Sequence, residues 1–96
     1  MKVYQINYNL RKQSNYDELY KKIKSYSNWC HPLNSCWIIT SNKTALEIQN
    51  DLTTILDHDD SLLITRLQNE AAWCNLDFHG SKVKTDWLKI NLSCAT

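Results

Sequence analysis

The residues best suited to chemistry in this chain are polar side chains near the ends of two predicted strands. The first strand ends at Asn9, and a polar turn, Asp57–Asp60, precedes the last strand. If these strands are antiparallel neighbours, the end of one lies beside the start of the other. The bend near His31 is expected to lie toward the same rim. We therefore expect one rim of the sheet to gather Asn9, Arg11, Lys12, His31, Asp59 and Asp60.

Two interpretations of this rim stay open. Carboxylate and amide oxygens bind hard divalent cations such as Mg²⁺ or Mn²⁺, and a histidine can join them for a transition metal. The candidate catalytic residues are then Asn9, Asp59 and Asp60. In the alternative, the aspartates cap Ser61 or pair with Arg11 and Lys12, as aspartates in surface turns commonly do. No residue is assigned as a metal ligand.

Basic residues suggest a second kind of site, one for nucleic acid. The candidate phosphate contacts are Arg11, Lys12 and Lys43. A row of three lysines in the first predicted helix would add to them: Lys21, Lys22 and Lys24. Tyrosine and tryptophan side chains would stack on bases. In the alternative, the aromatic side chains form the core and the lysines are solvated.

Other common kinds of site lack the residues or the spacing that they need. The four cysteines contain no Cys-x-x-Cys pair, which argues against a zinc ribbon or a thioredoxin-like motif. With Gly80 as the only glycine, a glycine-rich phosphate loop is excluded. For Ser35 and the cysteines as nucleophiles, no neighbouring base can be argued.

The pattern of apolar residues predicts six elements that would position these side chains. Alternation with period two indicates strands, and apolar residues three and four apart indicate helices. Ser14 or Asn15 is expected to cap the first helix, and Thr44 with Glu47 forms a capping-box pattern before the second. The predicted ranges are Val3–Asn9, Tyr16–Tyr26, a Trp-flanked stretch Trp29–Trp37, Cys36–Thr40, Thr44–Leu56 and Leu62–Leu67.

This order, βαββαβ, predicts an α+β fold of the ferredoxin-like, split βαβ type, with two helices on one face of an antiparallel sheet. The other face would be bare, and a 96-residue chain has a modest core, so a homodimer is favoured. We expect one domain over residues 1–92, with its core in 2–67, an extension over 68–92 and a frayed tail at 93–96. Within the extension, a short helix is predicted over Ser81–Leu92, with Val83, Trp87 and Ile90 on one side.

Charge and hydropathy limit the broad class of the protein. The net charge is +1, but residues 1–48 hold seven Lys/Arg against three Asp/Glu, whereas residues 49–96 hold four against seven. This asymmetry suggests a basic face and an acidic face. No apolar run is long enough for a signal peptide or a membrane span. We therefore expect no membrane partner, a cytoplasmic protein and reduced cysteines.

Two stretches of the chain resemble the Cas-two family, the small CRISPR-associated adaptation proteins related to the VapD toxins. The segment Val3–Leu10 is similar to the first strand of that family, and His31–Trp37 resembles its second-strand region. A Trp-x-His-x-Leu-x-Ser-x-Trp pattern, like that of uncharacterised bacterial and phage members, falls on Trp29, His31, Leu33, Ser35 and Trp37. The resemblance covers residues 2 to about 67.

The resemblance implies a ferredoxin-like homodimer that binds nucleic acid. For some members it also implies metal-dependent cleavage of RNA or DNA with Mg²⁺ or Mn²⁺, by an aspartate that ends the first strand. This chain has Asn9 there, and an amide has neither the charge nor the basicity of a carboxylate. Our interpretation is a nucleic-acid-binding dimer with weak or absent nuclease activity. The alternatives are a non-catalytic module of phage or mobile-element origin that binds a protein partner, and a metal-dependent endonuclease.

Overall fold

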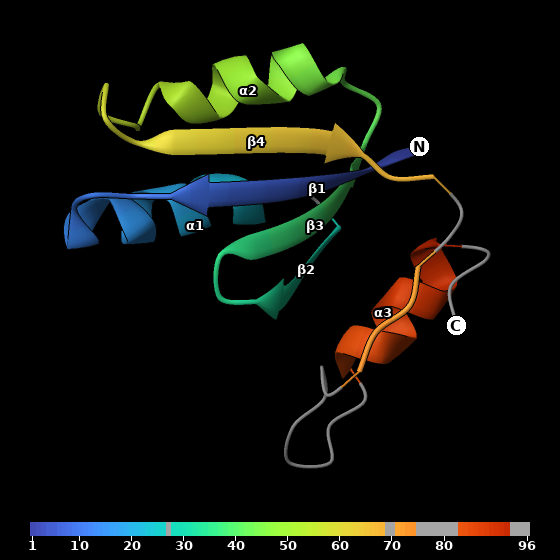
Figure 1. Cartoon of the computed structure of the whole chain (residues 1–96). Coiled ribbons are helices and arrows are strands. Elements are labelled where there is room, and N and C mark those ends of the chain that lie inside the picture. Colours follow the sequence, from blue (N-terminus) through green and yellow to red (C-terminus); the bar gives the residue numbers. More distant parts are fainter. Residues whose placement is uncertain (27, 69–70, 75–82, 93–96) are drawn as a thin grey trace.

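The computed structural model describes residues 1–26, 28–68, 71–74 and 83–92. The first six elements have the predicted order, βαββαβ, and one further helix follows them (Figure 1). The elements are β1 (Lys2–Asn9), α1 (Gln13–Lys24), β2 (Trp29–Leu33), β3 (Cys36–Ser41), α2 (Ala45–Thr53), β4 (Ser61–Arg66) and α3 (Val83–Asn91).

The four strands form one antiparallel sheet in the order β2-β3-β1-β4. In it Ile6 of β1 pairs with Trp37 of β3 on one side and with Ile64 of β4 on the other. The predicted pairing of the first and last strands is confirmed, because Asn9 at the end of β1 pairs with Ser61 at the start of β4. The molecule is thus an α+β protein whose sheet is compatible with a ferredoxin-like fold.

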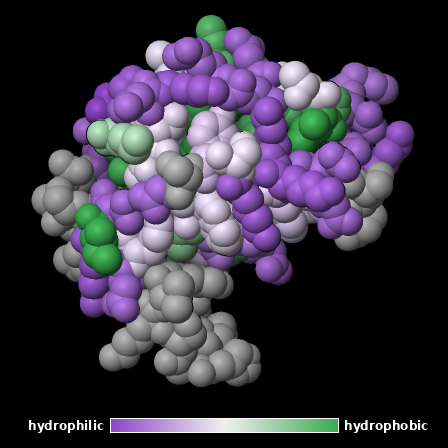
Figure 2. Space-filling model, turned by 180° about the vertical axis from the view of Figure 1, so that it is seen from behind, coloured by the Kyte–Doolittle hydropathy of each residue, from purple (hydrophilic) through white to green (hydrophobic). Residues whose placement is uncertain are grey.

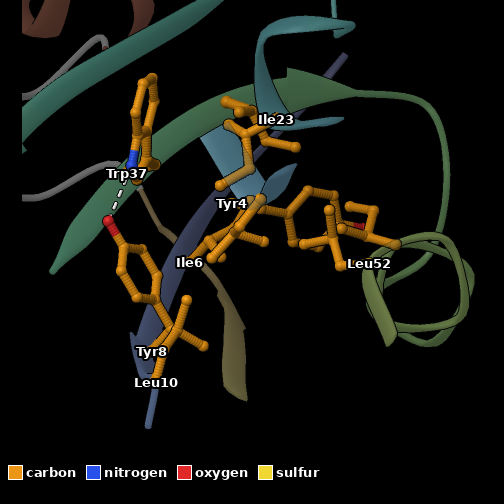
Figure 3. Close-up of a cluster of buried hydrophobic side chains, with 10 residues drawn as sticks. Tyr4, Ile6, Tyr8, Leu10, Ile23, Trp37 and Leu52 are labelled. Atoms are coloured by element: carbon orange, nitrogen blue, oxygen red, sulfur yellow. Dashed lines mark hydrogen bonds between the residues drawn. The ribbon is translucent and has the colours of Figure 1, made fainter. Parts of the chain in front are cut away.

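The main core lies between one face of the sheet and helices α1 and α2. Alternate residues of β1 point to this face, as period two requires, and Tyr4, Ile6 and Tyr8 are buried there. They pack with apolar residues of both helices and of β3 (Figure 3). The buried members of this cluster are Tyr4, Ile6, Tyr8, Leu10, Leu19, Ile23, Trp37, Ile39, Ile48 and Leu52.

A second apolar cluster covers part of the opposite face, which we predicted to be bare. Cys36 and Ile38 of β3 are buried there against Leu88 and Leu92. The helix predicted in the C-terminal extension is confirmed as α3, but its exposed Ile90 does not join the packed side. Among the helices that the structure describes, none is both long and apolar enough to span a membrane.

Helices α1 and α2 begin differently. At α2 the predicted capping box is confirmed: the Glu47 N–H donates to Thr44 Oγ1 at 3.2 Å, and the Thr44 N–H donates to Glu47 Oε1 at 2.9 Å. The cap predicted for α1 is wrong, because that helix begins at Gln13 after Lys12, which makes no side-chain cap. Asn15 lies inside the first turn of α1, where its side chain bonds to aspartates near β4.

Candidate nucleic-acid interface

Asp60 ties the turn before β4 to the start of α1. Its Oδ1 accepts a hydrogen bond from the backbone N–H of Arg11 at 2.8 Å. Its Oδ2 accepts from Asn15 Nδ2 and from the backbone N–H of Asp57, both at 2.9 Å. The backbone donors of Arg11 and Asp57 lower the pKa of the Asp60 carboxyl below its usual value. Asp60 is therefore an anchor within the fold.

Lys12, another residue of the predicted rim, is also paired with an aspartate. Lys12 Nζ lies 3.2 Å from Asp57 Oδ2, an ion pair of the kind that our alternative interpretation of this turn expects. Asn9 and Asp59 are exposed beside it. Across the described ranges, no group of three or more His, Cys, Asp or Glu side chains is arranged to hold a metal ion. His31 lies in β2, which β3 and β1 separate from β4, so it does not share a cluster with the aspartates.

Lys43, the third predicted phosphate contact, lies far from Arg11 and Lys12. The Tyr4 hydroxyl donates to the Lys43 carbonyl at 2.7 Å, which places Lys43 near the beginning of β1. Arg11 follows the end of that strand, roughly 20–25 Å away at 3.3 Å per residue. Lys43 Nζ is paired with Asp51 and lies 5.6 Å from the centre of the Tyr26 ring. The three predicted contacts thus belong to two separate places, each with its own aspartate.

The structure instead brings aromatic and basic side chains together where α1 meets β2. Trp29 and His31 are two residues apart in β2 and both contact the Trp37 ring, so they share one face of that strand. The Tyr20 ring of α1 packs edge-on against His31, with centroids 5.4 Å apart. We call Tyr20, Trp29 and His31 the aromatic patch. Trp29 is exposed and the other two are half-buried.

Buried hydrogen bonds hold the base of the aromatic patch. Trp37 Nε1 donates to Tyr8 Oη at 3.0 Å (Figure 3). Tyr8 Oη donates in turn to the Asn34 carbonyl at 2.8 Å. His31 Nε2 lies 3.1 Å from the same carbonyl, which can only accept, so this nitrogen carries the proton. Burial raises the pKa of the Tyr8 phenol far above its usual value, which keeps it a donor. The patch therefore rests on a fixed support.

Lysines of α1 border the aromatic patch. Tyr20 and Lys24 are four residues apart and lie one above the other on the helix. Lys24 Nζ is 5.4 Å from the centre of the Trp29 ring, a cation–π contact. Lys21, three residues before Lys24, is its neighbour on the helix surface, whereas Lys22 lines a separate hollow together with Asp51 of α2. Both Lys21 and Lys24 are exposed and free to meet phosphates.

The surface on the α1 side of the sheet is of mixed polarity, like the aromatic patch and its lysines. Figure 2 shows the side turned away from the viewer in Figure 1, the side on which α1 passes behind β1. A pale area of intermediate hydropathy occupies the middle of this side, and hydrophilic residues surround it. Strongly hydrophobic atoms appear only as separate spots. Such a surface suits a partly polar ligand better than a large apolar partner.

The aromatic patch combines residues that the sequence analysis assigned separately. The lysine row and the general class of aromatic side chains were predicted, but His31 was assigned to the rim and Trp29 was given no separate role. One signal was available: Trp29 and His31 are spaced by two in a strand, and Lys24 follows Tyr20 by four in a helix. A comparison with the models of known protein families finds no match to the chain, and a comparison with curated proteins finds no significant one.

Proposed function

We propose that this protein binds single-stranded nucleic acid at the aromatic patch and does not cleave it. The observation that carries the proposal is the contact between Lys24 and the exposed ring of Trp29, beside Tyr20 and His31. Bases stack on aromatic rings whatever their sequence, and neighbouring lysines neutralise phosphates. A duplex keeps its bases stacked on one another, so the patch favours a single strand.

The chemistry at the rim supports the absence of cleavage, since the exposed Asp59 belongs to no group of three or more potential metal ligands among the described residues. By the resemblance to the Cas-two family, Asn9 stands where some members of that family carry an aspartate. The oxygens of Asp60 are engaged by Arg11, Asn15 and Asp57. A nucleophile would need a carboxylate that is free to bind a metal or accept a proton. The resemblance to the Cas-two family supports nucleic-acid binding and a ferredoxin-like homodimer, both of which remain parts of this proposal.

The test is the anisotropy of a labelled single-stranded oligonucleotide, titrated at several salt concentrations. Trp29→Ala should weaken binding by ~1–3 kcal/mol, the usual worth of one stacked base. Lys24→Gln should lower the slope of log affinity against log salt by about 0.7. Lys89→Gln, which removes a lysine from α3 near the opposite face of the sheet, is the matched control and should change neither quantity. Equal weakening by all three variants, or no binding at low salt, would refute the proposal.

Cleavage is assayed with the same oligonucleotide in the presence of Mg²⁺ or Mn²⁺. We expect the substrate to stay intact. Cleavage that EDTA abolishes, and that the Asp60→Ala variant has lost, would show instead a metal-dependent nuclease at the rim. The circular dichroism spectrum of Asp60→Ala distinguishes loss of activity from loss of fold.

One observation favours a second function, the binding of a protein partner. A cavity of about 400 Å³ lies on the face of the sheet that α3 partly covers. Leu33, 58% exposed, lines it together with Ile38, Trp73 and Leu88. If the protein is such a module, a pull-down should retain a stable protein partner without nucleic acid, and Leu33→Lys should abolish that retention.

A further inference from the structure

Among the residues that the structure describes, no strand pairs with the outer side of β4. In the sheet order β2-β3-β1-β4, this strand lies at the edge and pairs with β1. The backbone N–H of Leu67 donates to the Val3 carbonyl at 2.8 Å, just beyond the paired residues. Hydrogen-bonded and non-bonded pairs alternate along an antiparallel ladder, so the odd-numbered residues of β4 bond to β1. The backbone N–H and C=O groups of Leu62, Ile64 and Arg66 therefore point away from the sheet.

The two edges of the sheet differ in their protection against pairing with another strand. The β2 edge contains Pro32, has an irregular register between Cys30 and Leu33, and packs against α3. All three features are known to block edge-to-edge association. The β4 strand has no proline, a regular register, and a single charged residue at its very end, Arg66. This edge is suited to accept a strand.

Exposed apolar side chains beside the β4 edge would also contact an added strand. A hollow of about 230 Å³ lies between α2 and β4, lined by Ala45, Leu46, Gln49, Leu62, Leu63 and Ile64. Leu46 is 64% exposed and Leu63 is 63% exposed. Leu63 alternates with the α2-facing residues of β4, so it belongs to the other face of the sheet. An added strand would contact Leu46 with one set of its side chains and Leu63 with the other.

We propose that this added strand is β4 of a second copy, paired antiparallel about Ile64, so that two four-stranded sheets join into one; the inference rests on the homodimer of the proposed function and assigns its interface. The opposite charges at the two ends of β4 favour a second copy as the partner and antiparallel pairing of the two strands. Asp59 and Asp60 precede β4 and Arg66 ends it, so antiparallel pairing sets each Arg66 beside the aspartates of the other copy. Parallel pairing would set like charges together. A two-fold interface needs such a self-complementary surface.

This pairing uses all the outward backbone groups of the strand. Centred on Ile64, it places Leu62 opposite Arg66 of the other copy and Ile64 opposite its own equivalent. Each hydrogen-bonded pair exchanges two backbone bonds, so about six form across the interface. The homodimer that we first expected would instead use the sheet face opposite α1 and α2, part of which α3 occupies.

Sedimentation equilibrium of the full chain over a range of concentrations tests the proposal. We expect a monomer–dimer equilibrium, and Leu63→Lys should raise its dissociation constant at least about tenfold. Leu33→Lys is the matched control, because it changes an equally exposed leucine of β2 and should leave the constant unchanged. A wild-type chain that stays monomeric, or a dimer that Leu33→Lys dissociates and Leu63→Lys does not, would overturn the proposal.

Amide hydrogen exchange gives a readout that needs no variant. In the dimer the amides of Leu62, Ile64 and Arg66 should exchange more slowly as the protein concentration rises. The amides of Leu63 and Thr65 bond to β1 and should be slow at every concentration. A dimer in which the even-numbered amides exchange as fast as in the monomer would exclude pairing through β4.

Discussion

The ring of His31 lies flat against the ring of Trp37, with centroids 3.9 Å apart and 11° between the planes. His31 belongs to an edge strand, whereas Trp37 is almost fully buried in the neighbouring strand. The stack therefore connects the partly exposed aromatic patch to the interior of the protein. Because Trp37 also donates to Tyr8, the orientation of the patch depends on a hydrogen bond in the core.

Tyr8→Phe should destabilise the protein. The substitution keeps the ring but removes the hydroxyl that joins Trp37 Nε1 to the Asn34 carbonyl. Leaving a buried donor unpaired costs ~1–3 kcal/mol. Denaturant unfolding measures the change. Tyr16→Phe is the control, because it keeps a ring that packs edge-on against Tyr8, with centroids 6.0 Å apart, and should lose little stability. Equal losses of stability in both variants would contradict the expectation.

Acid should weaken the link between α1 and β4 through Asp60. Its pKa is lower in the folded protein than in the unfolded chain, so its contribution to stability is present above the ordinary aspartate value, about 3.9. That contribution is lost as the pH falls through the lower, folded value. Asp60→Asn should therefore reduce stability at pH 7 and flatten the pH dependence below about 4.

Thermal unfolding at a series of pH values measures this effect. Asp59→Asn, a change at the exposed neighbouring aspartate, should leave the profile as it is in the wild type. If both variants give the same profile, the hydrogen bonds of Asp60 are not what stabilises the turn.

Thr44→Ala should remove the capping box of α2. It deletes the oxygen that accepts from the Glu47 N–H, a loss of ~1 kcal/mol of stability. The backbone N–H of Thr44, which the variant keeps, lowers the pKa of the exposed Glu47 carboxyl most, and the Thr44 side chain lowers it further. That pKa should therefore rise part of the way toward its usual value in the variant. NMR titration of Glu47 checks the second effect. Thr53→Ala at the end of α2 should leave that pKa unchanged.

Much of the fold could be predicted because its causes are local. Alternation in Val3–Asn9 and the three- and four-residue spacing in α2 are set by which side of an element is buried. The neighbouring positions of β1 and β4 followed from the order of elements and the rules of strand connection. The capping box at Thr44 could be predicted because both partners lie within one turn of helix.

Other features depended on residues far apart in the chain. Asn15 looked like a cap for α1, but Asp57 and Asp60, more than forty positions away, engage its amide. The position of α3 on the second face of the sheet depended on side chains of β3 that alternation alone leaves exposed.

The sequence by itself determined the elements, their order and the residues able to stack or to carry charge, because these depend on local periodicity and side-chain chemistry. Only the tertiary structure decided which of them meet. Lys24 lies over Trp29 and Lys43 beside Asp51, although both lysines looked alike in the sequence. The physical reason is that burial and charge pairing are properties of neighbours in space, and the packing of α1 on the sheet selects those neighbours.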